Sequence, residues 1–448
     1  MSDFPFTLGS AAQFHAPLPA SAEVVVIGGG VMGVMSAYFL AQRGVRVVLC
    51  EKGRIAAEQS SRNWGWIRQQ GRDFAELPIM MESLSHWQML ADQIGPDLGF
   101  RQDGVLYLAR SQAEMVGFQT WMERARGYGL DCGLKTGAQV LAMIPGHRAP
   151  WIGGLFTASD ARAEPKVAVP LLAREAARNG AVLIEDCAVR ALDRAAGRII
   201  GVLTEKGRIA CEQVVVAGGA WSSLFLRREG VALPQLSVLA SVAATGPLPE
   251  IFAGNAADGA FAFRRRADGG YTIAPGTNHD FFVGPDSFRH LGAFLPALRK
   301  DWRSTRFRAA APKGYPDGWG TDRRWSGDET SPFERQRILS PQPSIRALAA
   351  LSTEFARAFP AIGRPPMVTS WAGMIDTMPD LVPVVDRIAA VAGLVVATGL
   401  SGHGFGIGPG MGRVVADLVM GNSVGHDITR FRHARFSDGS TLEQGPTL

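Results

Sequence analysis

Two runs of consecutive hydrophobic residues near the start of the chain flank a segment that is apolar at helical spacing. Residues 23–27 and 45–49 are rich in valine, which predicts two strands buried on both faces. Residues 32–43 between them predict a helix. Strand, helix and strand in this order predict a βαβ unit with parallel strands.

The middle of the chain mixes short strands with helices. Between residues 235 and 345 the pattern alternates and holds many Gly, Pro and Arg residues, which predicts an antiparallel sheet and an inserted substrate domain. Residues 394–421 predict a strand, a glycine-rich loop and a helix, and residues 430–448 predict a polar tail. The other predicted helices are 111–128 and 170–178, and the other predicted strands are 104–109, 181–185, 199–204 and 213–217.

Composition narrows the class of protein. A chain of 448 residues fits two interleaved domains, and 46% hydrophobic residues are ordinary for a globular protein. The net charge of +5 includes no basic block, so nucleic acid is not an expected partner. The four cysteines lack metal-like spacing, which predicts reduced thiols and no metal site. No signal pattern and no apolar run of about 20 residues occur, which predicts a cytoplasmic protein without a transmembrane segment.

The sequence Gly-Gly-Gly-Val-Met-Gly at residues 28–33 follows a predicted strand and opens a predicted helix. Gly28 permits a tight turn, Gly30 lets the backbone approach a pyrophosphate, and Gly33 allows close packing of helix and strand. The helix N-terminus offers N–H groups and a positive dipole end to the phosphates. Glu51 ends the next predicted strand, where an acid bonds the ribose hydroxyls of a dinucleotide and disfavours a 2′-phosphate.

Two later segments favour FAD over NAD as the dinucleotide. Residues 214–222 (VVVAGGAWS) form a buried strand that ends in small residues and can return to the same sheet under the cofactor. Residues 396–406 (VATGLSGHGFG) form a second glycine-rich loop at a helix start. Its N–H groups and dipole suit the negatively charged N1–C2=O edge of a reduced flavin.

These patterns predict an α/β fold in which a Rossmann-like FAD-binding domain with a parallel sheet is interleaved with a substrate domain on a mixed or antiparallel sheet. The predicted FAD-binding domain comprises residues 22–100, 150–232 and 370–425. The predicted substrate domain comprises residues 101–149 and 233–369. Residues 1–21 predict a loose or clasping N-terminal tail, and residues 426–448 a C-terminal tail.

The three motifs, in this order and spacing, resemble the D-amino-acid oxidase superfamily of flavoenzymes, which includes glycine oxidase, sarcosine oxidase and D-amino-acid dehydrogenase. The similarity spans about residues 22–422. It implies an FAD-dependent oxidoreductase that acts on an amine or amino acid. The cofactor-binding residues implied are Gly28, Gly30, Val31, Met32, Gly33, Glu51, Lys52, Ser60, Ser61, Arg62, Asn63, Trp64, Gly65, Trp66, Val189, Ala217, Gly218, Trp221, Gly373, Gly399, Ser401, Gly402, His403, Gly404 and Phe405.

One position departs from the resemblance. Family members that act on simple α-amino acids often carry a carboxylate-binding arginine where this chain has Ile375, followed by Asp376. Three alternatives follow: another arginine binds the carboxylate, the acid group lies further from the reacting carbon, or Asp376 holds the distal ammonium of an amine. The candidate arginines are Arg68, Arg264 and Arg324, of which Arg68 directly follows the expected flavin-facing loop.

Three residues are therefore candidates for orienting the substrate: Arg68, Asp376 and His403, although His403 can also be a helix cap or a packed side chain. Trp64 and Trp66 either wall an apolar or cation–π pocket or pack the loop on the core.

The expected reaction is hydride removal from a carbon next to nitrogen, which gives an imine that water hydrolyses. Oxygen, a quinone or another electron-transfer acceptor would reoxidise the flavin. No cysteine follows Cys211, so the resemblance implies non-covalent FAD. Two alternatives stay open: a subunit of a hetero-oligomeric flavin dehydrogenase, and oxidation of a hydroxy acid. A homo-oligomer also stays open.

Overall fold

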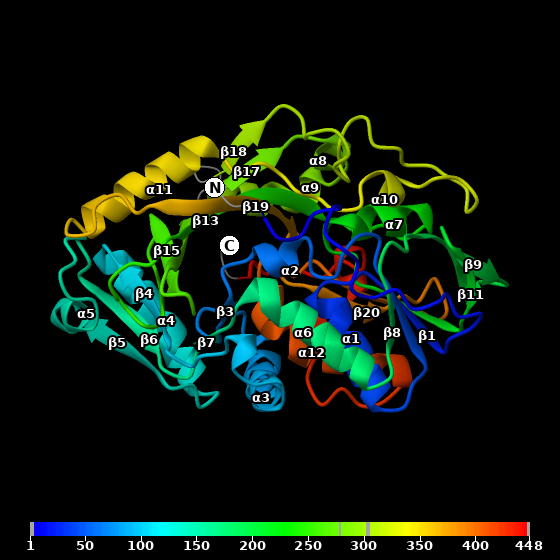
Figure 1. Cartoon of the computed structure of the whole chain (residues 1–448), viewed down its shortest axis with the longest axis horizontal. Helices are drawn as coiled ribbons and strands as arrows, with labels where there is room; N and C mark the ends of the chain where they lie inside the picture. Colours follow the sequence, from blue (N-terminus) through cyan, green and yellow to red (C-terminus); the bar gives the residue numbers. More distant parts are fainter. Residues whose placement is uncertain (1–3, 277–278, 302–304, 446–448) are drawn as a thin grey trace.

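The computed structural model describes residues 4–276, 279–301 and 305–445. Figure 1 shows a parallel sheet and its helices on one side of the molecule and a larger sheet on the other side. Long strands that run across the top of the view connect the two units. The mixed α/β fold predicted from the sequence is confirmed. No helix of the described residues is long and apolar enough to cross a membrane.

The parallel sheet has six strands in the order β20-β21-β12-β1-β2-β8. Strand β1 (Val24–Ile27) lies at its centre and pairs in parallel with β2 (Val47–Cys50) and β12 (Gln213–Val216). Both neighbours are apolar because the sheet is covered on both faces. The outer strands are β8 (Val182–Ile184), β21 (Leu394–Thr398) and the antiparallel β20 (Val384–Arg387).

Helix α1 (Val31–Gln42) is buried on every side, because it lies between the sheet and two other helices. Its partners are α12 (Gly404–Met420) and α6 (Pro165–Arg178). A Cβ atom at Gly412 would lie 2.6 Å from Cβ of Met35, so this glycine sets how closely α12 approaches α1. Helix α3 (Leu77–Ile94) packs on the other side of α12.

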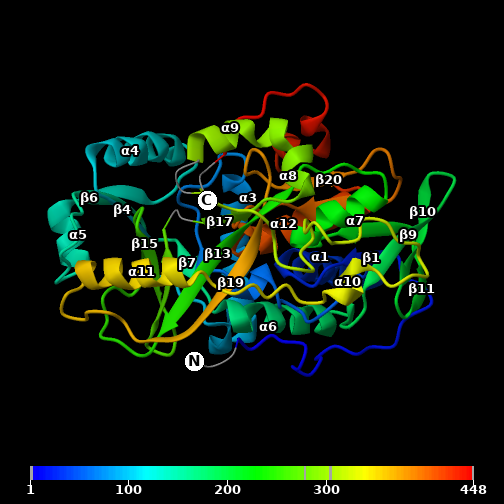
Figure 2. The same ribbon diagram turned by 90° about the horizontal axis from the view of Figure 1, so that it is seen from above.

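The ten-stranded sheet carries the second unit, and its longest strands are β13 (Leu236–Thr245) and β19 (Met367–Thr377), which pair antiparallel. In Figure 2 these two strands run diagonally across the molecule between the two units. The other strands are β4 (Val105–Ala109), β5 (Cys132–Thr136), β6 (Gly153–Thr157), β14 (Asn255–Ala257), β15 (Phe261–Arg265), β16 (Tyr271–Pro275), β17 (His279–Phe282) and β18 (Thr305–Arg308).

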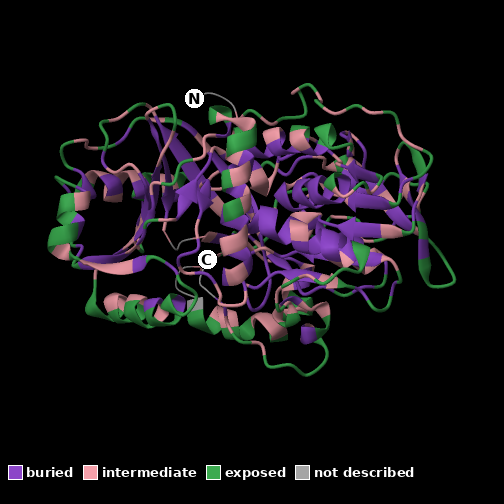
Figure 3. Cartoon of the chain, turned by 90° about the horizontal axis from the view of Figure 1, so that it is seen from below, coloured by how far each residue is buried: buried purple, intermediate pink, exposed green. Residues whose placement is uncertain are grey.

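Further helices lie against this sheet, against the parallel-sheet unit and on the connections between the two. In Figure 3 the peripheral helices contain many intermediate and exposed residues, whereas the interior of the parallel-sheet unit is mostly buried. The helices are α2 (Gln59–Arg62), α4 (Gln112–Arg126), α5 (Gly137–Met143), α7 (Ser222–Arg228), α8 (Pro285–Arg289), α9 (Leu291–Asp301), α10 (Pro332–Arg335) and α11 (Ile345–Ala358).

Two small sheets complete the fold. The first contains β9 (Val189–Ala195), β10 (Arg198–Thr204) and β11 (Gly207–Ala210). The second pairs β3 (Trp66–Ile67) with β7 (Ala161–Arg162). Four short 3₁₀ helices are Pro96–Leu98, Gly219–Trp221, Thr429–Phe431 and His433–Phe436.

Two strands that fall in the predicted FAD-binding domain pair within the ten-stranded sheet. Strands β6 and β19 lie in the ten-stranded sheet, whereas the sequence placed residues 150–157 and 370–377 in the FAD-binding domain. The cause is long-range pairing, of β6 with β4 and β5 and of β19 with β13, which no local pattern reveals.

The end segments of the chain pack on the fold. Arg435, in the predicted polar tail, is 5% exposed and forms an ion pair with Asp380. Backbone N–H groups of Gln13 and Phe14 donate to the Glu185 carboxylate, which supports the clasping alternative for the N-terminal tail.

Candidate functional site

A cavity opens at the carboxyl ends of β1, β2 and β12. Such an edge is where open α/β sheets bind their ligands. Nine of the predicted cofactor residues line it: Gly28, Gly30, Glu51, Lys52, Ser60, Val189, Ala217, Gly218 and Trp221. The cavity therefore brings together residues from three separated segments of the chain.

The glycine-rich turn at one wall of the cavity has the geometry that its sequence predicts. Gly28 has φ +110°, and a Cβ atom there would lie 2.5 Å from the carbonyl oxygen of Ala217. A Cβ atom at Gly33 would lie 1.9 Å from the carbonyl oxygen of Gly28. Only glycine fits at these two positions, and the turn delivers the N-terminus of α1 to the cavity.

Glu51 stands at the end of β2 and joins two backbone segments. Its carboxylate accepts hydrogen bonds from the N–H groups of Gly29 and Gly53, both at 2.7 Å. Burial raises the pKa of Glu51 to about 7, although Lys52 and the two N–H groups act against this shift. Each carboxylate oxygen keeps a second acceptor position, as hydroxyl donors of a ribose require.

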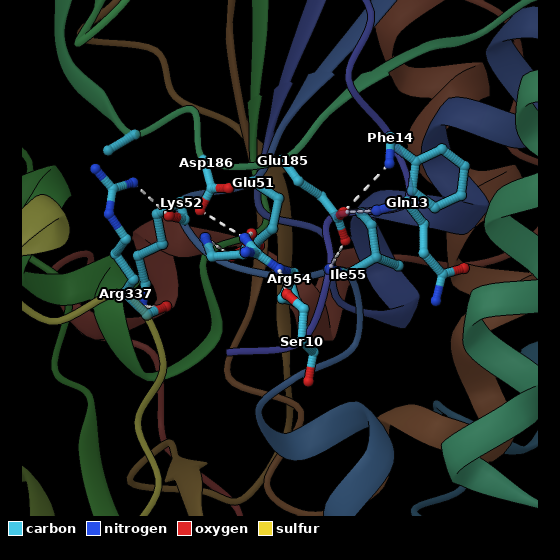
Figure 4. A network of polar contacts seen from close by, with 12 residues as sticks. Ser10, Gln13, Phe14, Glu51, Lys52, Arg54, Ile55, Glu185, Asp186 and Arg337 are labelled. Carbon is cyan, nitrogen blue, oxygen red and sulfur yellow. Dashed lines mark hydrogen bonds and ion pairs between the residues drawn. The ribbon is translucent and has the colours of Figure 1, made fainter. Parts of the chain in front are cut away.

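The rim of the cavity beside Glu51 is held by charged side chains (Figure 4). Lys52 Nζ donates to Glu58 at 2.8 Å and to the carbonyl oxygen of Arg337 at 2.7 Å, and it lies 4.3 Å from the ring centroid of Trp221. Arg54 forms an ion pair with Asp186 at 2.5 Å. Lys52 thus ties β2 to a distant loop as well as lining the cavity.

Asp376 joins the ten-stranded sheet to the glycine-rich loop after β21. Its Oδ2 accepts from the Gly399 N–H at 2.8 Å and from Gln235 Nε2 at 3.0 Å, and Gln59 Oε1 accepts from its backbone N–H at 3.2 Å. Asp376 is 2% exposed, and burial raises its pKa. These contacts favour an anchoring role for a residue that the sequence offered as an ammonium ligand.

The segment 60–66 turns beneath β19. Ser60 Oγ accepts from the Val31 N–H at 2.9 Å, which fixes the start of α1. The Arg62 guanidinium is buried and donates to the carbonyl oxygens of Ala57 and Ala372. Arg62 therefore contributes to packing through its side chain.

The remaining predicted residues of this segment contact one another. Asn63 Oδ1 accepts from the Gly65 N–H at 2.7 Å, and the rings of Trp64 and Trp66 meet edge to face, with their centroids 5.4 Å apart.

Two of the three candidate arginines are used or exposed elsewhere. Arg264 is 2% exposed and makes a bidentate pair with Glu164 at 2.8 and 3.0 Å. Arg324 is exposed on the surface. Arg68 donates to the carbonyl oxygen of Gln70 and lies 5.5 Å from the ring of Tyr107.

Arg68, which is half-buried, and His403, which is buried, belong to one group of polar side chains. Arg72 Nε donates to the Arg68 carbonyl oxygen at 3.1 Å, and His403 Nδ1 lies 3.4 Å from Oε2 of Glu76. Burial lowers the pKa of His403 well below its usual value, and the charges of Arg72 and Arg68 add to this effect. The structure thus brings two of the three predicted substrate-orienting residues together, and it adds Arg72 and Glu76.

The other predicted cofactor residues do not line this cavity. Gly373 lies against Arg62, where a Cβ atom would be 3.3 Å from Cβ of that residue. Ser401 Oγ accepts from the Met378 N–H at 3.3 Å. Residues that line the cavity and were not predicted include Arg54, Glu58, Gln59, Phe225 and Phe333. Their positions depend on long-range packing, and no motif marks them in the sequence.

The residues present fit FAD. The glycine turn, the α1 N-terminus and Glu51 suit the diphosphate and ribose, and the Asp376-anchored loop delivers the N-terminus of α12.

Three comparisons with known proteins agree with this geometry. The family model described as FAD dependent oxidoreductase matches residues 23–418. The solved structure of L-amino acid deaminase from Proteus myxofaciens in complex with anthranilate is 30% identical, with a TM-score of 0.90 over 95% of this chain and 96% of that chain. Sarcosine oxidase subunit beta of Rhizobium meliloti (strain 1021) is 26% identical over 430 residues, which are 94% of this chain and 90% of that protein.

A further relative is longer than this chain. Mitochondrial sarcosine dehydrogenase of Mus musculus is 30% identical over 234 residues, which are 50% of this chain. The chain covers a quarter (25%) of the length of that protein.

Proposed function

The chain belongs to the family of FAD-dependent oxidoreductases, as its motifs predicted, and we propose that it oxidises a carbon–nitrogen bond of an amine or amino acid. The observation that carries the proposal is a cavity lined by Gly28, Glu51 and Gln59. Gln59 is joined through Asp376 to the Gly399 loop, so the first glycine-rich turn and the second glycine-rich loop belong to one connected site. The names of its relatives, which include an amino acid deaminase and a sarcosine oxidase subunit, support a nitrogen-bearing substrate.

Bound FAD supplies the acceptor for a hydride from the carbon next to nitrogen. Glu51 would hold the adenosine ribose, and the N-terminus of α1 would face the diphosphate. The start of α12, with Gly402, His403, Gly404 and Phe405, would face the flavin. Arg68 would orient a substrate carboxylate, because in the described residues its guanidinium donates to the Gln70 carbonyl oxygen and forms no ion pair with an acid. We propose that FAD is bound without a covalent link.

The test is anaerobic reduction of the FAD-loaded protein. N-methylglycine, L-proline, L-phenylalanine, D-alanine and putrescine are mixed with the protein without air, and absorbance near 450 nm is followed. The proposal expects bleaching by at least one of them and by no hydroxy acid. Bleaching by lactate alone would replace it with hydroxy-acid oxidation. Readmitting oxygen, or a soluble quinone, then shows which acceptor restores the absorbance.

A second candidate is a catalytic subunit of a hetero-oligomer, favoured by the match to a protein named as a subunit. Light scattering on the purified protein gives its mass in solution. Amine-dependent bleaching by the chain alone, with turnover only after a partner is added, would support this candidate.

A further inference from the structure

A cluster of buried polar atoms without hydrogen-bond partners lies where residues 66–76 meet the start of α12. In the described part of the chain, it comprises Arg72 Nη1, both carboxylate oxygens of Glu76 and both ring nitrogens of His403. Leaving one such atom unpaired costs about 1–3 kcal/mol, so folded proteins contain few of them. Because these unpaired atoms lie together, we expect them to have a chemical function.

Glu76 and His403 are the centre of the cluster, and rigid elements hold both. Glu76 precedes the first turn of α3, and His403 precedes the first turn of α12. Two hydrogen bonds join helices α3 and α12. Ser83 Oγ and Trp87 Nε1 of α3 donate to the carbonyl oxygen of Gly406 in α12, at 2.7 and 2.9 Å. His403 Nδ1 therefore lies 3.4 Å from Glu76 Oε2, and Nε2 has no hydrogen-bond partner among the described residues.

Charged groups from several elements face this pair. Arg68 and Arg72 lie on the preceding loop, and Arg430 approaches from the C-terminal segment, where it pairs with Asp73 at 3.0 Å. Burial raises the pKa of Glu76 to about 7, although the three arginines act in the opposite direction. Burial lowers the pKa of His403 well below its usual value and so keeps the ring neutral, and the charges of Arg72 and Arg68 act in the same direction. The pair thus combines a carboxylate that can take a proton near neutral pH with an imidazole that does not retain one.

We propose that Glu76 and His403 form the proton-accepting pair of the amine oxidation, an inference that rests on the proposed function. His403 Nε2 takes one proton from the substrate ammonium, while Nδ1–H passes its proton to the Glu76 carboxylate. The ammonium becomes a neutral amine, whose lone pair then assists loss of a hydride, with two electrons, from the adjacent carbon to FAD. The substrate becomes an iminium ion, which water hydrolyses to a carbonyl compound and a protonated amine.

The arginines assist this step through their charge. A substrate ammonium bound beside Arg68 and Arg72 meets like charges, which lower its pKa and favour loss of its proton. If Arg68 also binds a substrate carboxylate, the ammonium is placed within the same group of side chains. The start of α12 then presents both the flavin-facing backbone and the proton acceptor.

The test compares flavin reduction in Glu76→Gln with the wild type between pH 6 and 10, under anaerobic conditions and with N-methylglycine, L-proline and L-phenylalanine as probes. In the wild type the rate should fall as the pH drops through about 7, because Glu76 becomes protonated. Glu76→Gln should be slower by about 10²–10⁴ at pH 7. Its rate should rise about tenfold per pH unit until the substrate ammonium itself titrates, and should approach the wild-type rate near pH 10.

Asp73→Asn is the matched control, because it removes a carboxylate from the same loop whose ionic partner is Arg430 instead of His403. It should keep the wild-type profile within a factor of about three. A loss in Glu76→Gln that is equal at every pH would show a purely structural role and would overturn the proposal. Rates that match the wild type at pH 7 would overturn it as well.

A second measurement is independent of turnover. Proton-detected ¹⁵N spectra of histidine-labelled, FAD-loaded protein report which ring nitrogen of His403 carries the proton, with His403→Gln used for assignment. The proposal expects protonated Nδ1 in the wild type at pH 8 and loss of that preference in Glu76→Gln. An unchanged tautomer would overturn the pairing. If no probe bleaches the wild type, the proposed function fails and the proton transfer falls with it, whereas these spectra still decide whether the pair exists.

Discussion

The carboxylate of Asp376 accepts the backbone N–H of Gly399 at 2.8 Å, and this bond joins the ten-stranded sheet to the glycine-rich loop at the start of α12. Gln235 and Thr398 donate to the same oxygen, at 3.0 and 3.4 Å. Because Asp376 is buried, no solvent can replace a lost acceptor. The loop that we expect to face the flavin therefore depends on a residue of the other sheet.

Removing this acceptor should weaken both the fold and the cofactor site. We expect Asp376→Ala to lower the free energy of unfolding by about 1–3 kcal/mol, because buried donors are left unpaired. FAD content should fall, since the Gly399 loop loses its anchor. Asp376→Asn should lose less, because its amide oxygen can still accept from Gly399. Urea unfolding and the ratio of absorbance at 450 and 280 nm measure the two effects. Equal FAD content in Asp376→Ala and wild type would contradict the anchoring role.

Replacing two glycines of the turn by alanine should affect different properties of the protein. Gly33→Ala places a methyl group 1.9 Å from the Gly28 carbonyl oxygen, so the turn cannot form and the protein should lose stability and FAD together. Gly30→Ala meets only Ser60 Oγ at 3.1 Å, so the protein should fold. Its affinity for FAD should nevertheless fall at least about tenfold, because the methyl group projects where the diphosphate approaches.

The control for these variants is Gly117→Ala in helix α4, where nothing lies within 4 Å of the added atom. It should gain about 0.5–1 kcal/mol through helix propensity and keep wild-type FAD affinity. Circular dichroism and titration of the apoprotein with FAD separate folding from binding. If Gly30→Ala binds FAD as tightly as the wild type, the diphosphate does not lie at this turn.

FAD affinity should depend on pH through Glu51. The pKa of Glu51 in the FAD-free protein is about 7, above its ordinary value, because the carboxyl group is buried. Ribose hydroxyls donate to the ionised form, so binding has to remove a proton below that pH. The dissociation constant should fall about tenfold per pH unit from pH 5 to 7 and level off above 7. Quenching of FAD fluorescence measures it, and Glu51→Gln should bind more weakly with no such slope.

The local motifs could be predicted from the sequence, whereas the contacts between them could not. Residues 28–33 and Glu51 were predictable because the chemistry of a βαβ turn is contained in about 30 consecutive residues. The contacts of Asp376 with Gln59 and Gln235 join residues more than 100 positions apart, and no periodicity marks them. Ile375 and Asp376 drew attention only through a departure from the family pattern.

Glu76 was missed for a related reason. It lies directly before helix α3, which the sequence did not predict, and its partner His403 comes 327 residues later. A glutamate beside a helix start is normally a surface residue that interacts with the helix dipole. Its complete burial follows from the packing of α3 on α12, which depends on the whole fold.

The C-terminal segment should contribute strongly to stability, although its sequence reads as a polar tail. Arg435 Nε and Nη2 donate to Asp380 at 2.9 and 3.1 Å, and Nη2 also donates to the Val382 carbonyl oxygen at 2.7 Å. Side-chain exposure is 5% for Arg435 and 2% for Asp380. Arg435→Leu would leave the Asp380 charge buried without its counter-ion, which costs about 3–5 kcal/mol.

The second variant and the control separate the lost charge pair from lost packing. Arg435→Leu combined with Asp380→Asn should regain a large part of the loss, because no unpaired charge remains. Arg432→Leu removes a guanidinium three residues earlier that is 42% exposed and pairs with Asp438, so it should cost at most about 1 kcal/mol. Urea unfolding of the FAD-loaded proteins gives the three values. If Arg435→Leu lowers the free energy of unfolding as little as we expect for Arg432→Leu, the segment lies on the surface and residues after 425 do not stabilise the fold.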